Sequence, residues 1–126
     1  MKTVEDLNRL IRDEIATIEA LRSEDEKIWS ARGGVTEANA KRSKKIRRMI
    51  GDHNNEIAHL RRLIRFVEAT PEEGVRMMLD QLHEQVARIT ASANRYKLKE
   101  QKKEYLTRAG AQFKHTQIAE LEFLLQ

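Results

Sequence analysis

The sequence predicts an all-α protein in which two long antiparallel helical hairpins form an elongated four-helix bundle or coiled-coil-like rod. Three observations support this prediction. Apolar residues recur at alternating intervals of three and four, which places them on one face of a helix. The composition is 35% charged and 5% aromatic with a single Pro, which is typical of long helices with large solvated faces. Three start signals for helices divide the chain.

The first two predicted helices begin at Thr residues that can cap them. Thr3 and Asp6 have the spacing of a capping box, in which each side chain accepts a hydrogen bond from the other residue's backbone N–H. Thr36 follows the glycine pair at 33–34, and Glu37 then stands at the positive end of the helix dipole. We therefore expect helices that begin near residues 3 and 36, with a glycine turn between them.

The third predicted helix begins at a Thr-Pro-Glu-Glu sequence. Thr70 is expected to be its N-cap and Pro71 its first helical residue, because the missing N–H of proline has no helical partner at that position. A residue before proline disfavours the helical conformation, so the preceding helix must end near residue 69. This boundary divides one predicted domain, 1–126, into a first hairpin, 3–69, and a second hairpin, 70–126.

Each predicted helix carries an apolar stripe, and the first two stripes follow the spacing of a coiled-coil seam. His53 stands in the second stripe, where we expect a buried residue that fixes the register of the helices. A surface histidine and a pH sensor are the alternatives. The stripe residues are Val4, Leu7, Ile11, Ile18, Leu21 and Ile28; then Ile46, Ile50, His53, Ile57, Leu60, Ile64 and Val67; then Val75, Met78, Leu79, Leu82, Val86 and Ile89; and last Leu106, Ala109, Phe113, Ile118, Leu121 and Leu125.

The end of the third helix has two interpretations, because no Gly or Pro occurs between Gly74 and Gly110. The chain can turn near Ser92–Asn94, whose side chains favour caps and turns. Alternatively, one helix continues from Pro71 to about Ala109. The distribution of charge favours the turn, since the segments 1–30, 36–69, 70–92 and 93–126 carry net charges of −3, +5, −2 and +3. An acidic helix followed by a basic helix thus occurs twice.

Composition and local patterns exclude several classes of function. The chain has no Cys, which rules out disulfides, thiolate catalysis and Cys-ligated zinc. Glu56 with His59, and Asp80 with His83, have the carboxylate-x-x-His spacing of di-iron helix bundles, but the last helix offers no matching ligands. We therefore expect no metal, no cofactor, no catalytic residue and no enzyme activity. The N-terminus lacks the apolar core of a signal peptide and no apolar run could span a membrane, so a cytoplasmic protein is expected.

Two basic clusters each lie just after a predicted hairpin turn, and the bundle topology would bring both to the same end. Each can be a solvated or internally paired face, a phosphate-binding surface or a groove for an acidic protein. A basic stripe on the second helix lies beside its apolar seam. The first cluster is Lys41, Arg42, Lys44, Lys45, Arg47 and Arg48, the second is Arg95, Lys97, Lys99, Lys102 and Lys103, and the stripe contributes Arg61, Arg62 and Arg65.

These features predict a non-enzymatic interaction protein, such as an adaptor, an inhibitor or an accessory subunit, which docks a protein partner and self-associates. Trp29, next to the first turn, is expected to plug the end of the bundle, or else to anchor a partner. The alternative function is binding of DNA or RNA without sequence specificity. Such binding would be electrostatic, because among the basic runs only Tyr96 offers a ring for stacking.

Overall fold

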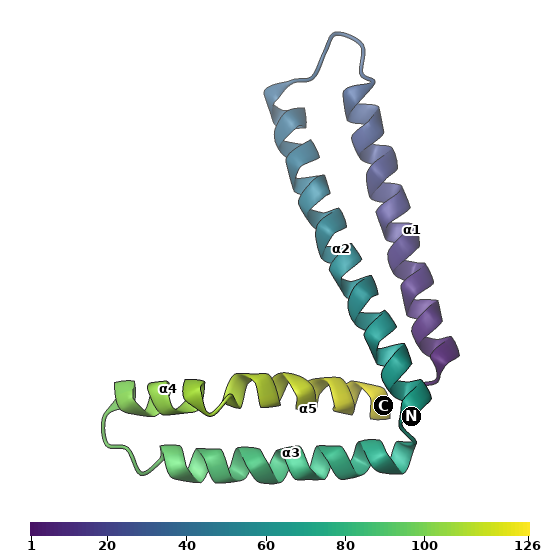
Figure 1. Ribbon diagram of the computed structural model, residues 1–126. Coiled ribbons are helices and arrows are strands. Elements are labelled where there is room, and N and C mark those ends of the chain that lie inside the picture. Colours follow the sequence, from purple (N-terminus) through teal and green to yellow (C-terminus); the bar gives the residue numbers. More distant parts are fainter. The chain divides into compact units, whose positions relative to one another are not determined.

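The computed structural model describes residues 1–126 and consists of helices connected by turns, without strands, which confirms the all-α prediction (Figure 1). The chain divides into two compact units, Thr3–Ala69 and a second unit made of Met1–Lys2 with Thr70–Gln126. Five helices are present where four were predicted. They are α1 (Val4–Trp29), α2 (Glu37–Ala69), α3 (Glu72–Ala93), α4 (Lys99–Arg108) and α5 (Ala111–Leu125).

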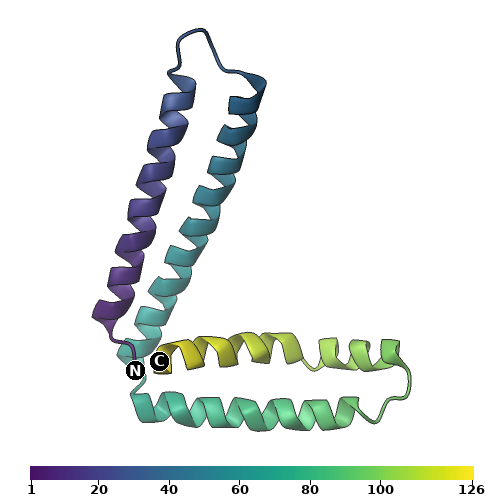
Figure 2. The ribbon, with the colours of Figure 1, turned by 180° about the vertical axis from the view of Figure 1, so that it is seen from behind.

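The unit Thr3–Ala69 is a hairpin in which α1 and α2 lie side by side and run in opposite directions (Figures 1 and 2). The connecting turn contains Gly33 and Gly34 with φ angles of 86° and 88°, a region that glycine enters without the steric cost of a side chain. One stripe of each helix is buried at the contact, and it agrees in part with the predicted stripes: Leu63 is buried where Ile64 was expected, and Ile64 is half-buried. The buried residues are Leu7, Ile11, Ile18 and Leu21 of α1 and Ser43, Ile46, Ile57, Leu60 and Leu63 of α2.

Both predicted caps in this unit are present. The backbone N–H of Asp6 donates to Thr3 Oγ1 over 3.1 Å, and the N–H of Thr3 donates to Asp6 Oδ2 over 2.9 Å, which completes the capping box of α1. The N–H of Asn39 donates to Thr36 Oγ1 over 3.1 Å at the start of α2. These bonds satisfy donors that the first turn of a helix leaves unpaired.

The predicted cap of α3 is wrong in its details. Pro71, not Thr70, is the N-cap, and it has an extended backbone with ψ of 160°, so that the helix begins at Glu72. No side chain caps this end. The carbonyl oxygen of Pro71 accepts the first helical hydrogen bond from Val75 N over 3.1 Å. Glu72 and Glu73 instead place two negative charges in the first turn, where they interact favourably with the helix dipole.

In the second unit, α3 ends at Ala93 and does not continue toward Ala109. Asn94 is the C-cap, and its N–H donates to the carbonyl oxygen of Thr90 over 3.0 Å. The turn near Ser92–Asn94, which the charge distribution favoured, is therefore confirmed. The reversal lets the chain return along α3, and α5 packs against α3 in both views (Figures 1 and 2).

The last predicted helix is divided into α4 and α5 by Gly110. This residue has φ of 71°, in the left-handed region, and immediately precedes α5. A left-handed residue ends a helix, which is why the apolar pattern from Leu106 to Leu125 does not form one helix. No residue of α4 is buried, whereas Ala111, Ile118, Leu121 and Leu124 of α5 are.

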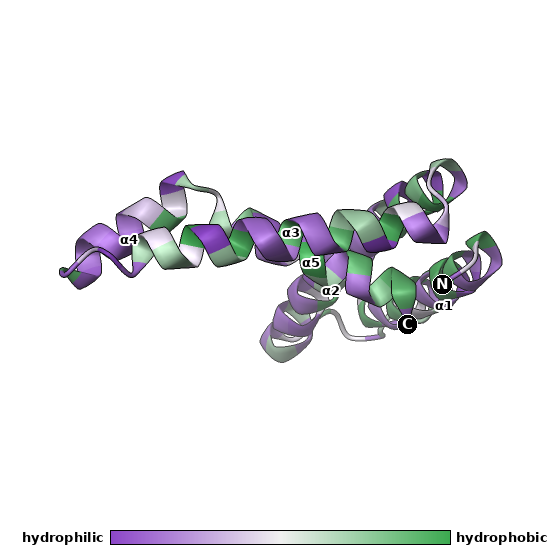
Figure 3. Ribbon diagram, turned by 90° about the horizontal axis from the view of Figure 1, so that it is seen from below, coloured by the Kyte–Doolittle hydropathy of each residue, from purple (hydrophilic) through white to green (hydrophobic).

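Figure 3 shows hydrophobic residues alternating with hydrophilic ones along the ribbon. None of the helices combines the length and hydropathy that a membrane-spanning segment requires. Residue Lys2 belongs to the unit of α5, because its N–H donates to the carbonyl oxygen of Leu124 over 2.6 Å. Its ammonium group also lies 4.7 Å from the centre of the Phe123 ring.

Replacing Ile46 by Ala should lower the free energy of unfolding of the hairpin by about 2–5 kcal/mol, because the fully buried side chain leaves a cavity between α1 and α2. Replacing Ile15, which is 38% exposed, should cost less than half as much. Both variants lose the same atoms from a helix, so their difference reports burial. Urea unfolding followed by circular dichroism measures it, and equal losses would contradict the packing described here.

Candidate interaction surfaces

Half of the first basic cluster is paired with acidic residues. The guanidinium of Arg42 makes two bonds to the carboxylate of Glu24 on α1, of 2.9 and 3.1 Å. Arg47 Nε lies 3.4 Å from Asp25 Oδ2, and Lys41 Nζ lies 3.6 Å from Glu37 Oε1. These three cations are therefore partly neutralised within the hairpin.

The other half of the cluster is free. Lys44, Lys45 and Arg48 are exposed and make no ion pair. They lie on the part of α2 that is near the glycine turn, at the turn end of the hairpin (Figure 1). The sequence alone did not separate paired from free cations, because the separation depends on which acidic residues of α1 lie opposite.

A buried polar network holds the same end of the hairpin together. Ser43 is 2% exposed; its hydroxyl donates to the carboxylate of Asp25 and accepts from the indole N–H of Trp29 over 2.9 Å. The hydrogen bond from Ser43 is the largest cause of a lowered pKa at Asp25, with further contributions from Arg47 and Trp29. The hydrogen bond from Arg42 likewise lowers the pKa of the Glu24 carboxyl. Sequence reasoning missed this network, although a Ser in an apolar stripe predicts a polar partner on the facing helix.

Trp29 is bonded to this network but is not buried within it. Its indole is 53% exposed, with the N–H held by Ser43 and one face 5.5 Å from the guanidinium carbon of Arg47. The ring therefore covers part of the hairpin end while keeping an exposed surface of its own. Its expected role as an anchor for a partner stays a prediction.

His53 connects the two helices near the middle of the hairpin. Its Nδ1 lies 2.5 Å from Glu14 Oε2 of α1, and both side chains are half-buried, 30% and 25% exposed. His53 is half-buried and not buried as the sequence predicted, and the register role expected for it stays a prediction that this contact supports. The facing acid, Glu14, could not be identified from the stripe alone.

The basic stripe on α2 borders a shallow groove of about 240 Å³ between α1 and α2. Gly51 lies on the same stripe, and an added Cβ there would meet nothing within 4 Å. Tight packing inside the hairpin is therefore not the reason for a glycine at this position. Of the stripe's cations, Arg61 lines the groove, Arg62 lies 3.4 Å from His59 Nδ1, and Arg65 is exposed. The groove residues are Ile15, Ile18, Glu19, Arg22, Asn54, Ile57, Ala58 and Arg61.

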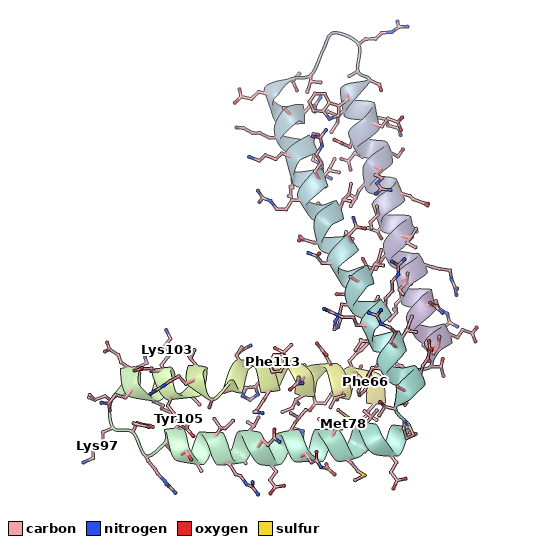
Figure 4. The ribbon with its side chains drawn as sticks, viewed as in Figure 1. Phe66, Met78, Lys97, Lys103, Tyr105 and Phe113 are labelled. Carbon is pink, nitrogen blue, oxygen red and sulfur yellow. The ribbon has the colours of Figure 1, made fainter.

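The second basic cluster surrounds the turn between α3 and α4 and makes no ion pair. An aromatic pair lies within it, since the rings of Tyr96 and Tyr105 have centroids 5.4 Å apart and planes inclined by 38°. The sequence identified only Tyr96; Tyr105 joins it because α4 folds back over the turn. Figure 4 shows Lys97 in the turn, Tyr105 on the side of α4 toward α3, and Lys103 on the opposite side.

A groove of about 530 Å³ lies beside this cluster, where α4 gives way to α5. Its apolar part includes Leu106 and Ala111, and its edge includes the 68% exposed ring of Phe113. The lining residues are Thr90, Ala93, Lys102, Lys103, Leu106, Thr107, Gly110, Ala111, Gln112, Phe113 and His115. This surface was not predicted, because it depends on the break at Gly110.

The apolar stripe of α3 is only partly covered. Val75 is fully buried, but Met78 is 40% exposed and Met77, beside the stripe, is 58% exposed. The rest of the predicted stripe is half-buried, namely Leu79, Leu82, Val86 and Ile89. The cause is that α3 has a single helical layer against it, and α4 contributes no buried residue to that layer.

Neither carboxylate-x-x-His pair belongs to a metal site, because no group of three or more His, Asp and Glu side chains is placed to hold an ion. His83 Nε2 lies 3.6 Å from Glu122 Oε1, and Arg62 is adjacent to His59. His59 and His83 each contact another side chain, but neither belongs to a set of three or more side chains arranged to hold a metal ion.

Comparisons of the chain with models of protein families, with curated proteins and with solved structures gave no match. The surfaces described above therefore carry the functional argument.

Replacing Asp25 by Asn should lower the midpoint of thermal unfolding at neutral pH. A carboxyl with a lowered pKa stabilises the fold above its ordinary pKa, 3.8 for Asp, and the contribution is lost as the pH falls through the lowered value. The difference between variant and parent should therefore be smaller at a pH below 3.8 than at neutral pH. Melting followed by circular dichroism measures it.

The matched control is Asp13→Asn, which alters an exposed carboxylate of α1 that has no ion pair. This control should shift the midpoint little at either pH. A pH-independent loss in Asp25→Asn would show that the network does not depend on the charge of Asp25.

Proposed function

We propose that the protein is a non-enzymatic helical interaction protein, an adaptor, inhibitor or accessory subunit, which docks a macromolecular partner through its helical faces and basic ends. The observation that carries this proposal is the partly covered stripe of α3. Met78 at 40% exposed, with Leu79, Leu82, Val86 and Ile89 half-buried, leaves an apolar strip along the helix. Such a strip is typical of a surface that a partner covers.

The energetics favour association over exposure. Each Å² of apolar surface removed from water contributes about 25 cal/mol, so completing the burial of several half-exposed side chains contributes several kcal/mol. Part of this is offset by the entropy lost on association. Self-association is the simplest way to complete the layer, and the elongated four-helix bundle expected from the sequence is part of this proposal.

The free cations add selectivity for an acidic partner. Lys44, Lys45 and Arg48 at one turn, and the second basic cluster at the other, make no ion pair, and all of them except the half-buried Lys102 are exposed. Exposed charges contribute little affinity but raise association rates and disfavour basic partners. Apolar burial thus supplies the binding energy in this proposal, and charge selects the partner.

The proposal predicts that Met78→Glu weakens association by at least about tenfold, which corresponds to about 1.4 kcal/mol. Ala87→Glu is the matched control, because it adds the same charge nine residues away, half a turn around α3. Sedimentation equilibrium measures self-association, and mass spectrometry identifies proteins that co-purify stoichiometrically from the native host. A monomeric parent protein with no stoichiometric companion would overturn the proposed function.

Binding of nucleic acid without sequence specificity is the second candidate, and the aromatic pair favours it. Tyr96 and Tyr105 lie among the unpaired cations Lys97, Lys99 and Lys102, and rings within a basic surface are typical of single-strand binding. The alternative also fits the free cations of the first cluster.

For this alternative, a plot of log affinity against log salt should have a slope near −5 for about six phosphate contacts on duplex DNA. Changing Lys97, Lys99 and Lys102 together to Gln should flatten the slope. Arg42→Gln should change it little, because that cation is already bonded to Glu24. A protein that fails to retard DNA or RNA at low salt would eliminate this candidate.

A further inference from the structure

The groove beside the break between α4 and α5 has the size and composition of a binding site. Its volume of about 530 Å³ falls within the range of pockets that bind ligands. Leu106 and the nearly buried Ala111 give it an apolar part, and the 68% exposed ring of Phe113 stands at its edge. An exposed aromatic ring beside an apolar hollow is the arrangement of an interface anchor.

The groove exists because Gly110 turns the chain. With φ of 71°, Gly110 separates α4 from α5, and no residue of α4 is buried. Figure 4 shows Lys103 on α4 and Phe113 on α5 projecting from the side that faces away from α3. A cation and an aromatic ring are therefore presented on one side of the break by two different helices.

The charge around the groove is strongly positive. Its lining includes Lys102, Lys103 and His115 and contains no acidic residue. Residues 95–115 contain seven basic and two acidic side chains, and one of those acids, Glu104, lies 3.8 Å from Arg108 and is already paired. Lys102 and Lys103 have no ion pair. The groove is thus complementary to a ligand that is both apolar and anionic.

We propose that this groove docks an acidic amphipathic helix of a partner protein, with its apolar side chains against Leu106, Ala111 and Phe113 and its carboxylates paired with Lys102 and Lys103. The proposal rests on the proposed function and names the chemistry of the partner. An apolar floor beside cations matches a helix that carries leucines on one face and acids on the flanks. A nucleic acid duplex would leave that apolar floor without a partner, since its phosphates contact only the cations.

The probe is a fluorescein-labelled synthetic peptide of about 18 residues, long enough to form a helix, with Leu on one face and Glu on the others. Fluorescence anisotropy with the full chain should give saturable binding. Lys102→Glu/Lys103→Glu should weaken binding at least about tenfold, because two attractions become two repulsions. The matched control is Arg9→Glu/Arg12→Glu, which reverses two exposed cations on α1 that make no ion pair, and it should leave the affinity within about twofold.

A second pair of variants tests the apolar part. Phe113→Ala should weaken the peptide at least about fivefold, whereas Met77→Ala, which truncates another exposed apolar side chain, should not. Circular dichroism checks that each variant keeps the helicity of the parent. A peptide with Lys in place of Glu should not bind, and a peptide with the same composition and scrambled Leu positions should bind weakly.

Several outcomes would overturn the proposal. Equal losses in the two charge-reversal variants would indicate attraction by net charge and no docking in the groove. Displacement of the peptide by duplex DNA, or by dodecanoate, at lower concentration than by unlabelled peptide would assign the groove to phosphates or to fatty acids. Competition from a second copy of the chain would assign it to self-association.

The two proposals can fail separately. If Met78→Glu disrupts association while the acidic peptide does not bind, the interaction function stands and the groove proposal falls. If the peptide binds as described while the parent protein neither self-associates nor retains a partner, the stripe of α3 is not the docking face. In that case the groove proposal stands, and the proposed function fails.

Discussion

A helix that packs against one neighbour can bury only one stripe of its surface, and the rest of this structure follows from that limit. In the hairpin, α1 and α2 each bury a single row of side chains, from Leu7 to Leu21 and from Ser43 to Leu63. In the second unit, α3 has one layer of helix against it, and α4 contributes nothing buried to that layer. Apolar surface therefore remains on α3, and the proposed function uses that surface.

Because burial is so limited, polar contacts have an unusually large part in fixing the register of the hairpin. Apolar seams of leucine and isoleucine tolerate sliding by a heptad, whereas a bond between two specific side chains does not. Such bonds occur at two separate points along the helices: His53 contacts Glu14 near the middle, and Ser43 with Asp25 and Arg42 with Glu24 join the helices nearer the turn. The same network at the turn end includes Trp29 and Arg47. The alignment of the two helices therefore also determines where these two surface side chains lie.

Ion pairing also determines which basic residues remain available to bind a ligand. Arg42 and Arg47 form ion pairs with acidic residues of α1, whereas the cluster around the turn between α3 and α4 pairs with no acidic side chain. The groove next to that free cluster combines cations with apolar side chains. Such a combination favours a folded, acidic partner over a bare polyanion, since only the folded partner can contact both the cations and the apolar side chains.

The sequence determined the features that depend on neighbours along the chain: the helical period, the capping box at Thr3 and the turn at the glycine pair. It also placed His53 in the stripe, and it favoured a turn near Asn94 over a longer third helix. Tertiary structure decided what depends on the facing helix, namely that Ser43 meets Asp25, that Arg42 is paired while Lys44 is not, and that α3 is half-covered. The left-handed turn at Gly110 decided where α4 lies. The reason is physical. Periodicity and capping arise from hydrogen bonds between residues a few positions apart, whereas the pairing of side chains depends on how one helix is aligned against another.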